Sequence, residues 1–376
     1  MIFNFLIFCT AIAFSFVCYG NDAFNTSEIE IPDGMSFLPE DYYFNSEAIF
    51  TEEDNWKKFE FHGFLEFTTP IKGKDDDSQQ PSSRFEDQNE LILWMRKHIS
   101  QELSFNSEIE IKEGFQKYEL EILQLDYEII PELLVFRLGK FKYPFGIERF
   151  VEDGPYDKLV DRPFPSIRII PGTYSDIGGM LYGLIPLKNK TPFKYEFAVT
   201  NGLEGPEPQH VQQFTDNNSN KAIGGRISYE CFSGFEFGGS FSRGAYDNDN
   251  QLDLIFWGTD LQFTRGNFEL RGEYITGIVE QTSKDGGDYH RNGYYLQTSY
   301  KYPCNVNHCR YLEGVFRFDS VDPNRDITDG EEADRVAIGI NYSPMEHVEF
   351  KFEYAVENEP GEDIHGKSFF QTIFRW

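Results

Sequence analysis

The sequence predicts an all-β protein, a transmembrane antiparallel β-barrel of about 16 strands with a long third loop folded into the lumen. Segments of about ten residues alternate between apolar and polar side chains along most of the chain. Their connections alternate between short turns and longer polar loops. One connection, about 35 residues long, separates strands ending near residue 141 and starting near residue 176, and a loop that long is usually functional.

Composition favours one large β domain. The 376 residues show no shift in composition that would mark a second domain. The mean hydropathy is -0.49, and no apolar run reaches about 18 residues beyond the N-terminus, which excludes a helical membrane protein. A formal net charge of -29 excludes nucleic acid as a partner, because phosphate binding needs clustered Lys and Arg.

The N-terminus predicts export. Residues 1–20 are apolar and end in small residues before Asn21, which is typical of a cleaved signal peptide, although no Lys or Arg precedes the apolar run. A lipoprotein anchor at Cys18 is the alternative. Residues 21–55 are acidic and lack periodicity, so we interpret them as a periplasmic N-terminal leader. The β-barrel is then expected over residues 56–376.

The first strand shows the alternation that recurs to the end of the chain. Phe59 and Phe61 share one face, and Glu60 and His62 share the other. Sixteen strands are predicted, with bounds good to a few residues: 57–69, 89–100, 103–112, 118–129, 133–141, 176–186, 191–201, 221–230, 234–243, 252–264, 268–279, 291–302, 310–320, 334–343, 347–356 and 366–376. An even count with short turns at one end and long loops at the other is typical of an outer-membrane barrel.

The last strand adds a targeting signal. Phe370, Phe374 and Trp376 lie on one face, and the chain stops on the aromatic residue. This resembles the C-terminal signal through which the barrel-assembly machinery recognises its substrates. The alternative is that a C-terminal edge strand ends in Trp without any such role.

Three segments also resemble a known family. They are Gly139-Lys140-Phe141-Lys142-Tyr143-Pro144-Phe145-Gly146, Asp176-Ile177-Gly178-Gly179-Met180-Leu181-Tyr182-Gly183 and Phe316-Arg317-Phe318-Asp319-Ser320-Val321-Asp322-Pro323-Asn324. They are similar to motifs of the outer-membrane porin family that includes the phosphate-selective porins. The resemblance covers about residues 56–376. It implies a sixteen-stranded, usually trimeric pore in the bacterial outer membrane, constricted by its third loop.

Charges of both signs alternate along the third loop. Its predicted pore-constriction residues are Arg149, Glu152, Asp153, Asp157, Lys158, Asp161, Arg162 and Arg168. Mixed signs set up a transverse field, whereas a ring of one sign selects counter-ions. We therefore predict weak cation preference or none, and phosphate or anion selectivity is the alternative. Each of these charges could instead anchor the loop in a salt bridge, and loop aromatics such as Tyr143 and Phe164 could form a sugar track or simply pack.

Polar residues on the inward strand faces are predicted to line the lumen: Glu108, Glu110, Arg271, Glu273, Arg317, Glu349, Lys351 and Glu353. Cys304 and Cys309 are a disulfide candidate in an exported protein, with a zinc site as the alternative. No other metal site and no cofactor is predicted. The nearest resemblance to a catalytic group, Asp285, Asp288 and His290, lacks a nucleophile, so an enzyme is not expected.

The predicted function is passive diffusion of small hydrophilic solutes or ions through a water-filled channel. The predicted partners are outer-membrane lipid, the solutes themselves, further copies in a homotrimer and the barrel-assembly machinery. The alternative from another class is a secreted β-sandwich that binds carbohydrate. Such a sandwich would bury its apolar faces against a second sheet.

Overall fold

The computed structural model describes residues 59–71, 88–112, 116–150, 154–172, 174–186, 192–211, 214–282, 286–327, 331–361 and 364–376. The predicted signal peptide over residues 1–20, the alternative anchor at Cys18 and the predicted leader over residues 21–55 lie outside these ranges. In the described part of the chain, no helix has the length and apolar character needed to cross a bilayer.

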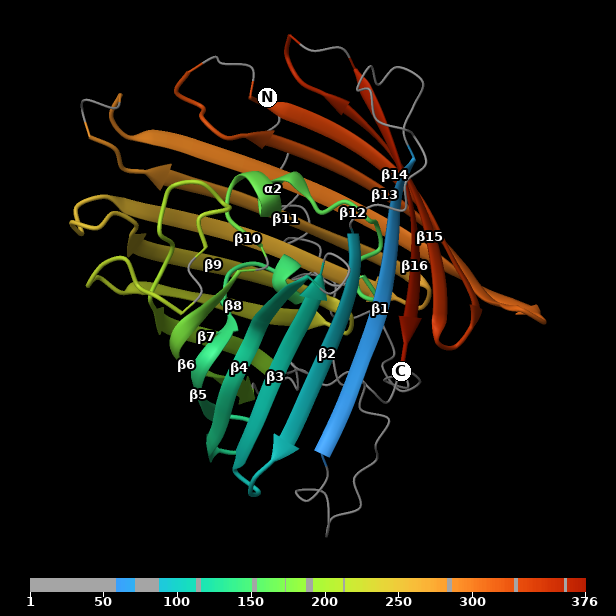
Figure 1. Cartoon of the computed structure of the whole chain (residues 1–376), viewed down its shortest axis with the longest axis horizontal. Coiled ribbons are helices and arrows are strands. Elements are labelled where there is room, and N and C mark those ends of the chain that lie inside the picture. Colours follow the sequence, from blue (N-terminus) through green and yellow to red (C-terminus); the bar gives the residue numbers. More distant parts are fainter. Residues whose placement is uncertain are drawn as a thin grey trace, which may run out of the picture. The chain divides into compact units, whose positions relative to one another are not determined.

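The strands form one closed antiparallel barrel, in which each strand pairs with its neighbours in sequence and β1 pairs with β16 (Figure 1). The predicted sixteen-stranded antiparallel β-barrel is confirmed. The sixteen strands are β1 Phe59–Ile71, β2 Gln88–His98, β3 Leu103–Lys112, β4 Lys117–Ile130, β5 Leu134–Lys142, β6 Ser175–Pro186, β7 Pro192–Thr200, β8 Ala222–Phe232, β9 Phe235–Ala245, β10 Asp253–Arg265, β11 Phe268–Val279, β12 Tyr289–Val306, β13 Cys309–Asp322, β14 Ala333–Met345, β15 Val348–Asn358 and β16 His365–Arg375.

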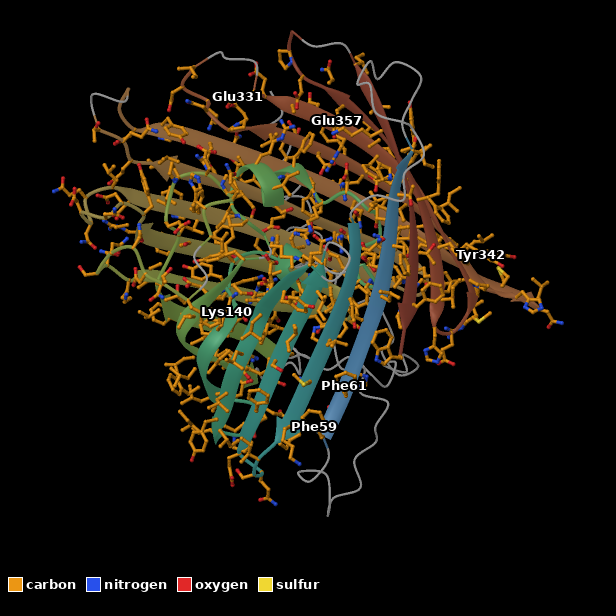
Figure 2. The ribbon with its side chains drawn as sticks, viewed as in Figure 1. Phe59, Phe61, Lys140, Glu331, Tyr342 and Glu357 are labelled. Carbon is orange, nitrogen blue, oxygen red and sulfur yellow. A yellow bond between two sulfur atoms is a disulfide. The ribbon has the colours of Figure 1, made fainter. Side chains whose placement is uncertain are left out.

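The barrel turns its apolar faces outward. On β15, Glu349, Lys351 and Glu353 are buried, whereas Phe352 and Tyr354 are exposed. On β1, Phe59 and Phe61 are likewise exposed near the start of the strand (Figure 2). This is the reverse of a soluble protein and is the pattern of a barrel surrounded by lipid. It also contradicts the β-sandwich alternative, in which the apolar faces would be covered.

Strand bounds differ most from the prediction at the β12–β13 hairpin. We expected a turn from Pro303 onward, because proline lacks the N–H that a ladder needs. Instead the pairing continues past an irregularity between Pro303 and Val306, and the strands turn at His308, which adopts a φ of 62°. A β-bulge of this kind absorbs the proline without ending the strand. Cys304 and Cys309 form a disulfide across this hairpin.

The seam between the first and last strands is closed by backbone pairs and one large aromatic side chain. Gly63 donates to the carbonyl of Trp376 at 3.3 Å, and the Trp376 N–H donates back to Gly63 at 3.1 Å. A Cβ atom on Gly63 would meet the Trp376 ring at 2.6 Å. Glycine is therefore needed where the indole crosses β1.

The long connection between β5 and β6, residues 143–174, is called the third loop here. It contains two short helical turns, η4 Glu148–Phe150 and α2 Phe164–Arg168. Its apolar side chains join a buried cluster with inward-facing residues of the strands. The core of the molecule thus lies inside the barrel, between the third loop and the wall.

Candidate functional site

The first residues of the third loop pack against β8, β9 and β10. The Tyr143 hydroxyl shares a hydrogen bond with Ser242 at 2.9 Å, and the Gly146 N–H donates to Ser240 at 3.0 Å. Gly146 has a φ of 66°, and a Cβ atom there would collide with the Glu273 carboxylate. Glycine therefore allows the loop to turn directly against the wall.

Apolar packing holds the second half of the loop. Phe164, Ile169, Ile170 and Tyr174 are buried in one cluster with strand residues, which include Leu254, Phe256, Ile275, Val279 and Val321. These strand residues face inward near the loop end of β10, β11 and β13. An apolar inward patch is unusual for a water-filled barrel, whose interior is typically polar. The loop explains it, because the patch is the surface on which α2 and the residues after it pack.

Ion pairs hold the loop between these two regions. Arg149 pairs with Glu196 of β7, and the Asp157 carboxylate accepts from Arg271 of β11 at 3.1 Å. Further pairs are Lys158 with Glu313 at 2.8 Å and Glu269 at 3.2 Å, Asp161 with Arg335 at 3.2 Å, Arg168 with Glu359 at 2.5 Å, and Glu148 with Arg271 at 3.9 Å. The partners come from strands β7, β11, β13 and β14 and from the β15–β16 connection.

Strand side chains also bind the loop backbone. The Glu353 carboxylate accepts from the N–H groups of Val160 and Asp161 at 2.5 and 2.9 Å. Lys351 donates to the carbonyls of Gly154 and Asp157. A buried loop needs such partners, because unpaired backbone groups away from water are costly. Charged strand residues therefore hold the loop backbone in place, although this segment has almost no regular secondary structure.

Two loop side chains have a raised pKa, which favours the neutral form of one and the charged form of the other. Burial raises the pKa of the Glu148 carboxyl above its ordinary value, although Arg271 opposes the shift. The Glu148 carboxylate accepts a hydrogen bond from the Tyr295 hydroxyl. Burial lowers the pKa of Lys158, but Glu269 and Glu313 outweigh it and raise that pKa above its ordinary value. Lys158 is thus kept charged by the wall carboxylates.

The structure places the predicted constriction residues as follows. Arg149 and Asp157 are buried in ion pairs, and Lys158, Asp161 and Arg168 are partly exposed in ion pairs. Arg162 is partly exposed, and its carbonyl accepts a hydrogen bond from Arg335. Glu152 and Asp153 lie outside the described residues. Whether any of these side chains borders the narrowest point stays a prediction.

All eight predicted lumen-lining residues face inward and are buried. Arg271, Lys351 and Glu353 bind the third loop, and Arg317 donates to the Asp161 carbonyl at 2.7 Å. Of the other four, Glu273 lies against Gly146, Glu349 pairs with Arg375, and Glu110 pairs with Lys112. The fourth is Glu108 of β3. At least half of this set therefore contacts protein at the very positions expected to contact solute.

Residues beyond the predicted set complete these contacts. Asp319 is fully buried, and its carboxylate accepts from Arg317 at 3.0 Å, from Arg335 at 3.1 Å and from the Phe164 N–H at 3.2 Å. Arg335 and Glu313 were not singled out from the sequence as site residues. Their positions could have been read from the alternation, because Arg335 shares a strand face with Asn341 and faces away from Val336 and Ile338, and Glu313 shares a face with Arg317.

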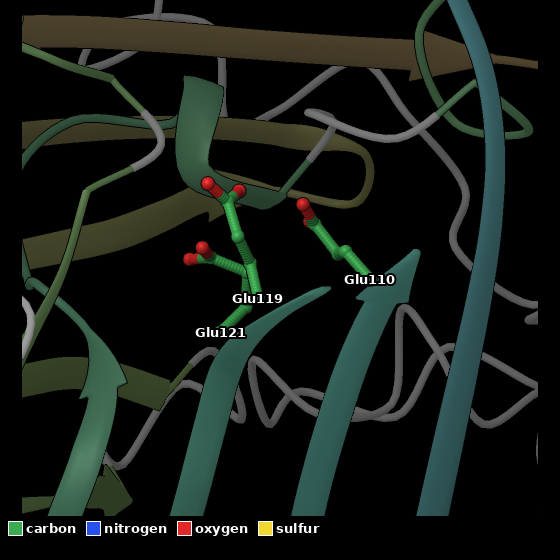
Figure 3. A group of neighbouring side chains, drawn as sticks. All are labelled: Glu110, Glu119 and Glu121. Atoms are coloured by element: carbon green, nitrogen blue, oxygen red, sulfur yellow. The ribbon is translucent and has the colours of Figure 1, made fainter. Parts of the chain in front are cut away.

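A second group of charges lies on β3, β4 and β5. Glu110, Glu119 and Glu121 lie close together on one side of these strands (Figure 3). Among the described residues, these three carboxylates form the group whose oxygens are close enough together to hold a metal ion. However, Lys112 pairs with Glu110 and with Glu119 at 3.0 Å, and Lys117 pairs with Glu119 at 2.7 Å. Matched lysines make this an ion-pair cluster.

A closed sixteen-stranded barrel with an apolar exterior and an internal loop defines a bacterial outer-membrane porin, and the family comparison agrees. The family model for phosphate-selective porin O and P matches residues 198–363. The resemblance to that family is thereby confirmed. The chain is an outer-membrane channel, and its fold and its match to this family model indicate a channel more than an enzyme.

Individual relatives are distant. An uncharacterized protein of Aquifex aeolicus (strain VF5) is 26% identical over 329 residues, which cover 77% of this chain and 73% of that protein. The anion-selective porin from Comamonas acidovorans superposes with a TM-score of 0.58 at 12% identity, over 85% of this chain and 99% of that porin. OmpF of Salmonella typhi superposes with a TM-score of 0.58 at 13% identity, over 85% of this chain and 98% of that protein. The trimer form of Vibrio cholerae OmpT gives 0.54 at 11% identity over 85% and 99%. These structural likenesses show the fold.

Proposed function

We propose that this protein is a porin for passive diffusion of small hydrophilic solutes or ions, with weak cation preference or none. The observation that carries this proposal is the pairing of the basic residues on the third loop. Arg149, Lys158 and Arg168 each pair with a carboxylate. A guanidinium or ammonium that is already neutralised by a neighbour contributes little net field to a passing anion.

The charges on the wall formed by β1 to β5 also favour cations over anions. Its strands carry more carboxylates than basic side chains: Glu60, Glu66, Glu90, Glu108, Glu110, Glu119, Glu121, Asp126 and Glu128 against Arg96, Lys97, Lys112, Lys117, Arg137, Lys140 and Lys142. A modest excess of negative charge raises the local cation concentration in a narrow aqueous path. We propose that solutes pass between this wall and the third loop, whose predicted constriction charges would border that path.

Anion selectivity is the second candidate. The family model is that of phosphate-selective porins, and the Comamonas porin is described as anion-selective. The test is single-channel conductance and reversal potential of the purified protein in a planar bilayer under a salt gradient. Step-like currents with a slight cation preference would support the proposal. A clear anion preference would favour the second candidate, and no current from folded protein would contradict both.

A matched pair of variants makes the test specific to the wall. Neutralising Glu119→Gln together with Glu121→Gln should lower the cation-to-anion permeability ratio by about twofold, as expected when fixed charges beside a pore are removed. Asp253→Asn removes a carboxylate that pairs with Arg243 at the rim of β10, and it should leave the ratio unchanged. Equal effects of both changes would argue against a path along β3 and β4.

We further propose a homotrimer, for which the trimer form of Vibrio cholerae OmpT is the structural parallel. Export through a signal peptide over residues 1–20, a periplasmic leader over residues 21–55 and insertion through the C-terminal strand complete the proposal. Native mass spectrometry in a mild detergent would measure the copy number directly. A single mass equal to one chain would contradict the trimer without bearing on the channel.

A further inference from the structure

A polar cavity opens on the outer face of the barrel, away from the lumen. It has a volume of about 320 Å³ and lies at the loop ends of β12 to β15. The residues that matter for its chemistry are Tyr294, Ser320, Asp322, Arg325, Asp334 and Asn358. The proposed channel does not use this cavity.

Strand register explains why polar side chains gather there. Tyr294 is paired with Ser320, Ser320 with Asp334, and Asp334 with Asn358, so the four form one row across four strands. Directly paired residues on neighbouring strands point to the same side of a sheet. The Tyr294 side chain interacts with the side chains of Ser320 and Asp334 beside it in this row.

The neighbouring row, one step toward the short turns, is entirely apolar. It consists of Leu296, Phe318, Val336 and Val356, which are paired in the same way. Phe318 also contacts the Tyr294 ring, with centroids 6.0 Å apart. The outer face therefore changes from apolar to polar within a single row. This change marks the upper edge of the lipid-facing band, where aromatic residues typically sit.

The chemistry of the cavity favours sugar hydroxyls. Carboxylate and amide side chains can accept from and donate to adjacent hydroxyl groups, and the ring of Tyr294 in the cavity lining offers an apolar face with a polar tip. A cavity of this size with a few convergent polar groups is within the range of small-ligand sites. We propose that this cavity binds a neutral saccharide unit, presented either on an outer-leaflet glycolipid or free in solution.

Two other ligand classes fit less well. Asp322, Glu332 and Asp334 outnumber Arg325, so the cavity repels phosphate groups. A divalent cation needs several oxygen ligands close together. Among the described residues, these three carboxylates do not converge as Glu110, Glu119 and Glu121 do. The saccharide is left as the ligand that the charges and the tyrosine both suit.

The test uses the full-length protein in nanodiscs with two probes. Maltotriose represents a free saccharide and is followed by saturation-transfer difference NMR. A monoglucosyl diacylglycerol doped into the nanodisc represents a membrane saccharide and is followed by co-purification after exchange into plain lipid. Tyr294→Ala and the milder Asp334→Asn should each weaken binding about tenfold, which corresponds to about 1.4 kcal/mol. Asp253→Asn, at the same rim on β10, should bind like the unaltered protein.

The outcomes separate the sources. Binding of either probe that falls in both variants supports the proposal and identifies the source as lipid-bound, free or both. Unchanged binding in both variants would place the sugar elsewhere, for example in the lumen, and would overturn it. Failure of the unaltered protein to bind either probe, or equal competition by inorganic phosphate, would also overturn it. Bilayer conductance of the same variants should be unchanged, so the result does not depend on the proposed channel selectivity.

Discussion

Two parts of the barrel wall use their inward charges differently. On β11 to β15, charged side chains bind the third loop, as Arg271 does with Asp157 and Glu353 does with two loop N–H groups. On β2 to β5, charged side chains bind each other, as Arg137 does with Asp126 at 2.6 Å. The third loop reaches this second wall through Tyr156, whose ring meets Trp94 edge-on at 6.3 Å. The wall of β11 to β15 therefore positions the third loop, and the wall of β2 to β5 lies opposite it.

The largest expected effect comes from removing the carboxylate at the centre of the loop-binding wall. Asp319→Ala leaves Arg317 and Arg335 without their shared partner and removes the acceptor of the Phe164 N–H. Breaking a buried ion pair in this way costs about 3–5 kcal/mol. The temperature at which the folded band disappears from unboiled gels should fall, and single-channel current should become larger and noisier as the loop loosens.

Asp126 on β4 allows a matched change on the wall of β2 to β5. Asp126 is also buried and accepts from Arg137 and from Asn106 at 3.0 Å, but its partners lie on strands. Asp126→Ala should lower thermal stability by a similar amount and leave the current steady. If both variants produced the same noise, the third loop would not be positioned selectively by β11 to β15.

A smaller effect is expected at the seam between β1 and β16, which lies outside both of these walls. Gly63→Val places a side chain where the Trp376 ring now lies. Forcing extra atoms into a packed site costs about 1–3 kcal/mol, so we expect a lower unfolding temperature in the same gel assay. Conductance of the molecules that do fold should be normal. An unaltered unfolding temperature would show that the indole is free to move off β1.

Period-two alternation predicted the barrel because each strand needs only its own residues to define an inside and an outside. Val348 to Val356 shows this, since its three charged residues all lie on one face, with Ala355 as the one apolar residue beside them. The site was less predictable. Arg149 and Glu196 are 47 residues apart, and Asp161 and Arg335 are 174 apart, so no local spacing signals either pair. The inward parity of Arg335 was readable, but its partner depends on where an irregular loop travels.

A single hydrogen-bond acceptor on the loop-binding wall should have a modest effect. Glu353→Gln keeps the size of the side chain and one oxygen that can accept from the N–H groups of Val160 and Asp161, but it removes the negative charge of that acceptor. Hydrogen bonds to a neutral acceptor are weaker than those to a carboxylate, and the loss should be about 1 kcal/mol. We expect brief closures in single-channel records with little change in thermal stability. Glu108→Gln, a buried inward carboxylate on β3, is the control and should not introduce closures.

The smallest effect is expected at the turn of the β12–β13 hairpin, which is remote from the contacts between the walls and the third loop. Cys304→Ser with Cys309→Ser removes the disulfide. The strands β12 and β13 already pair from Asn292 with Asp322 down to Val306 with Cys309. Tyr342, labelled in Figure 2, also donates to the His308 carbonyl at the tip. Because the ends are held without the bond, the loss should stay below about 1 kcal/mol, at the low end of disulfide contributions. Gels run with and without reductant would measure it, and a large drop in unfolding temperature would mean that the strand pairing near the tip depends on the bond.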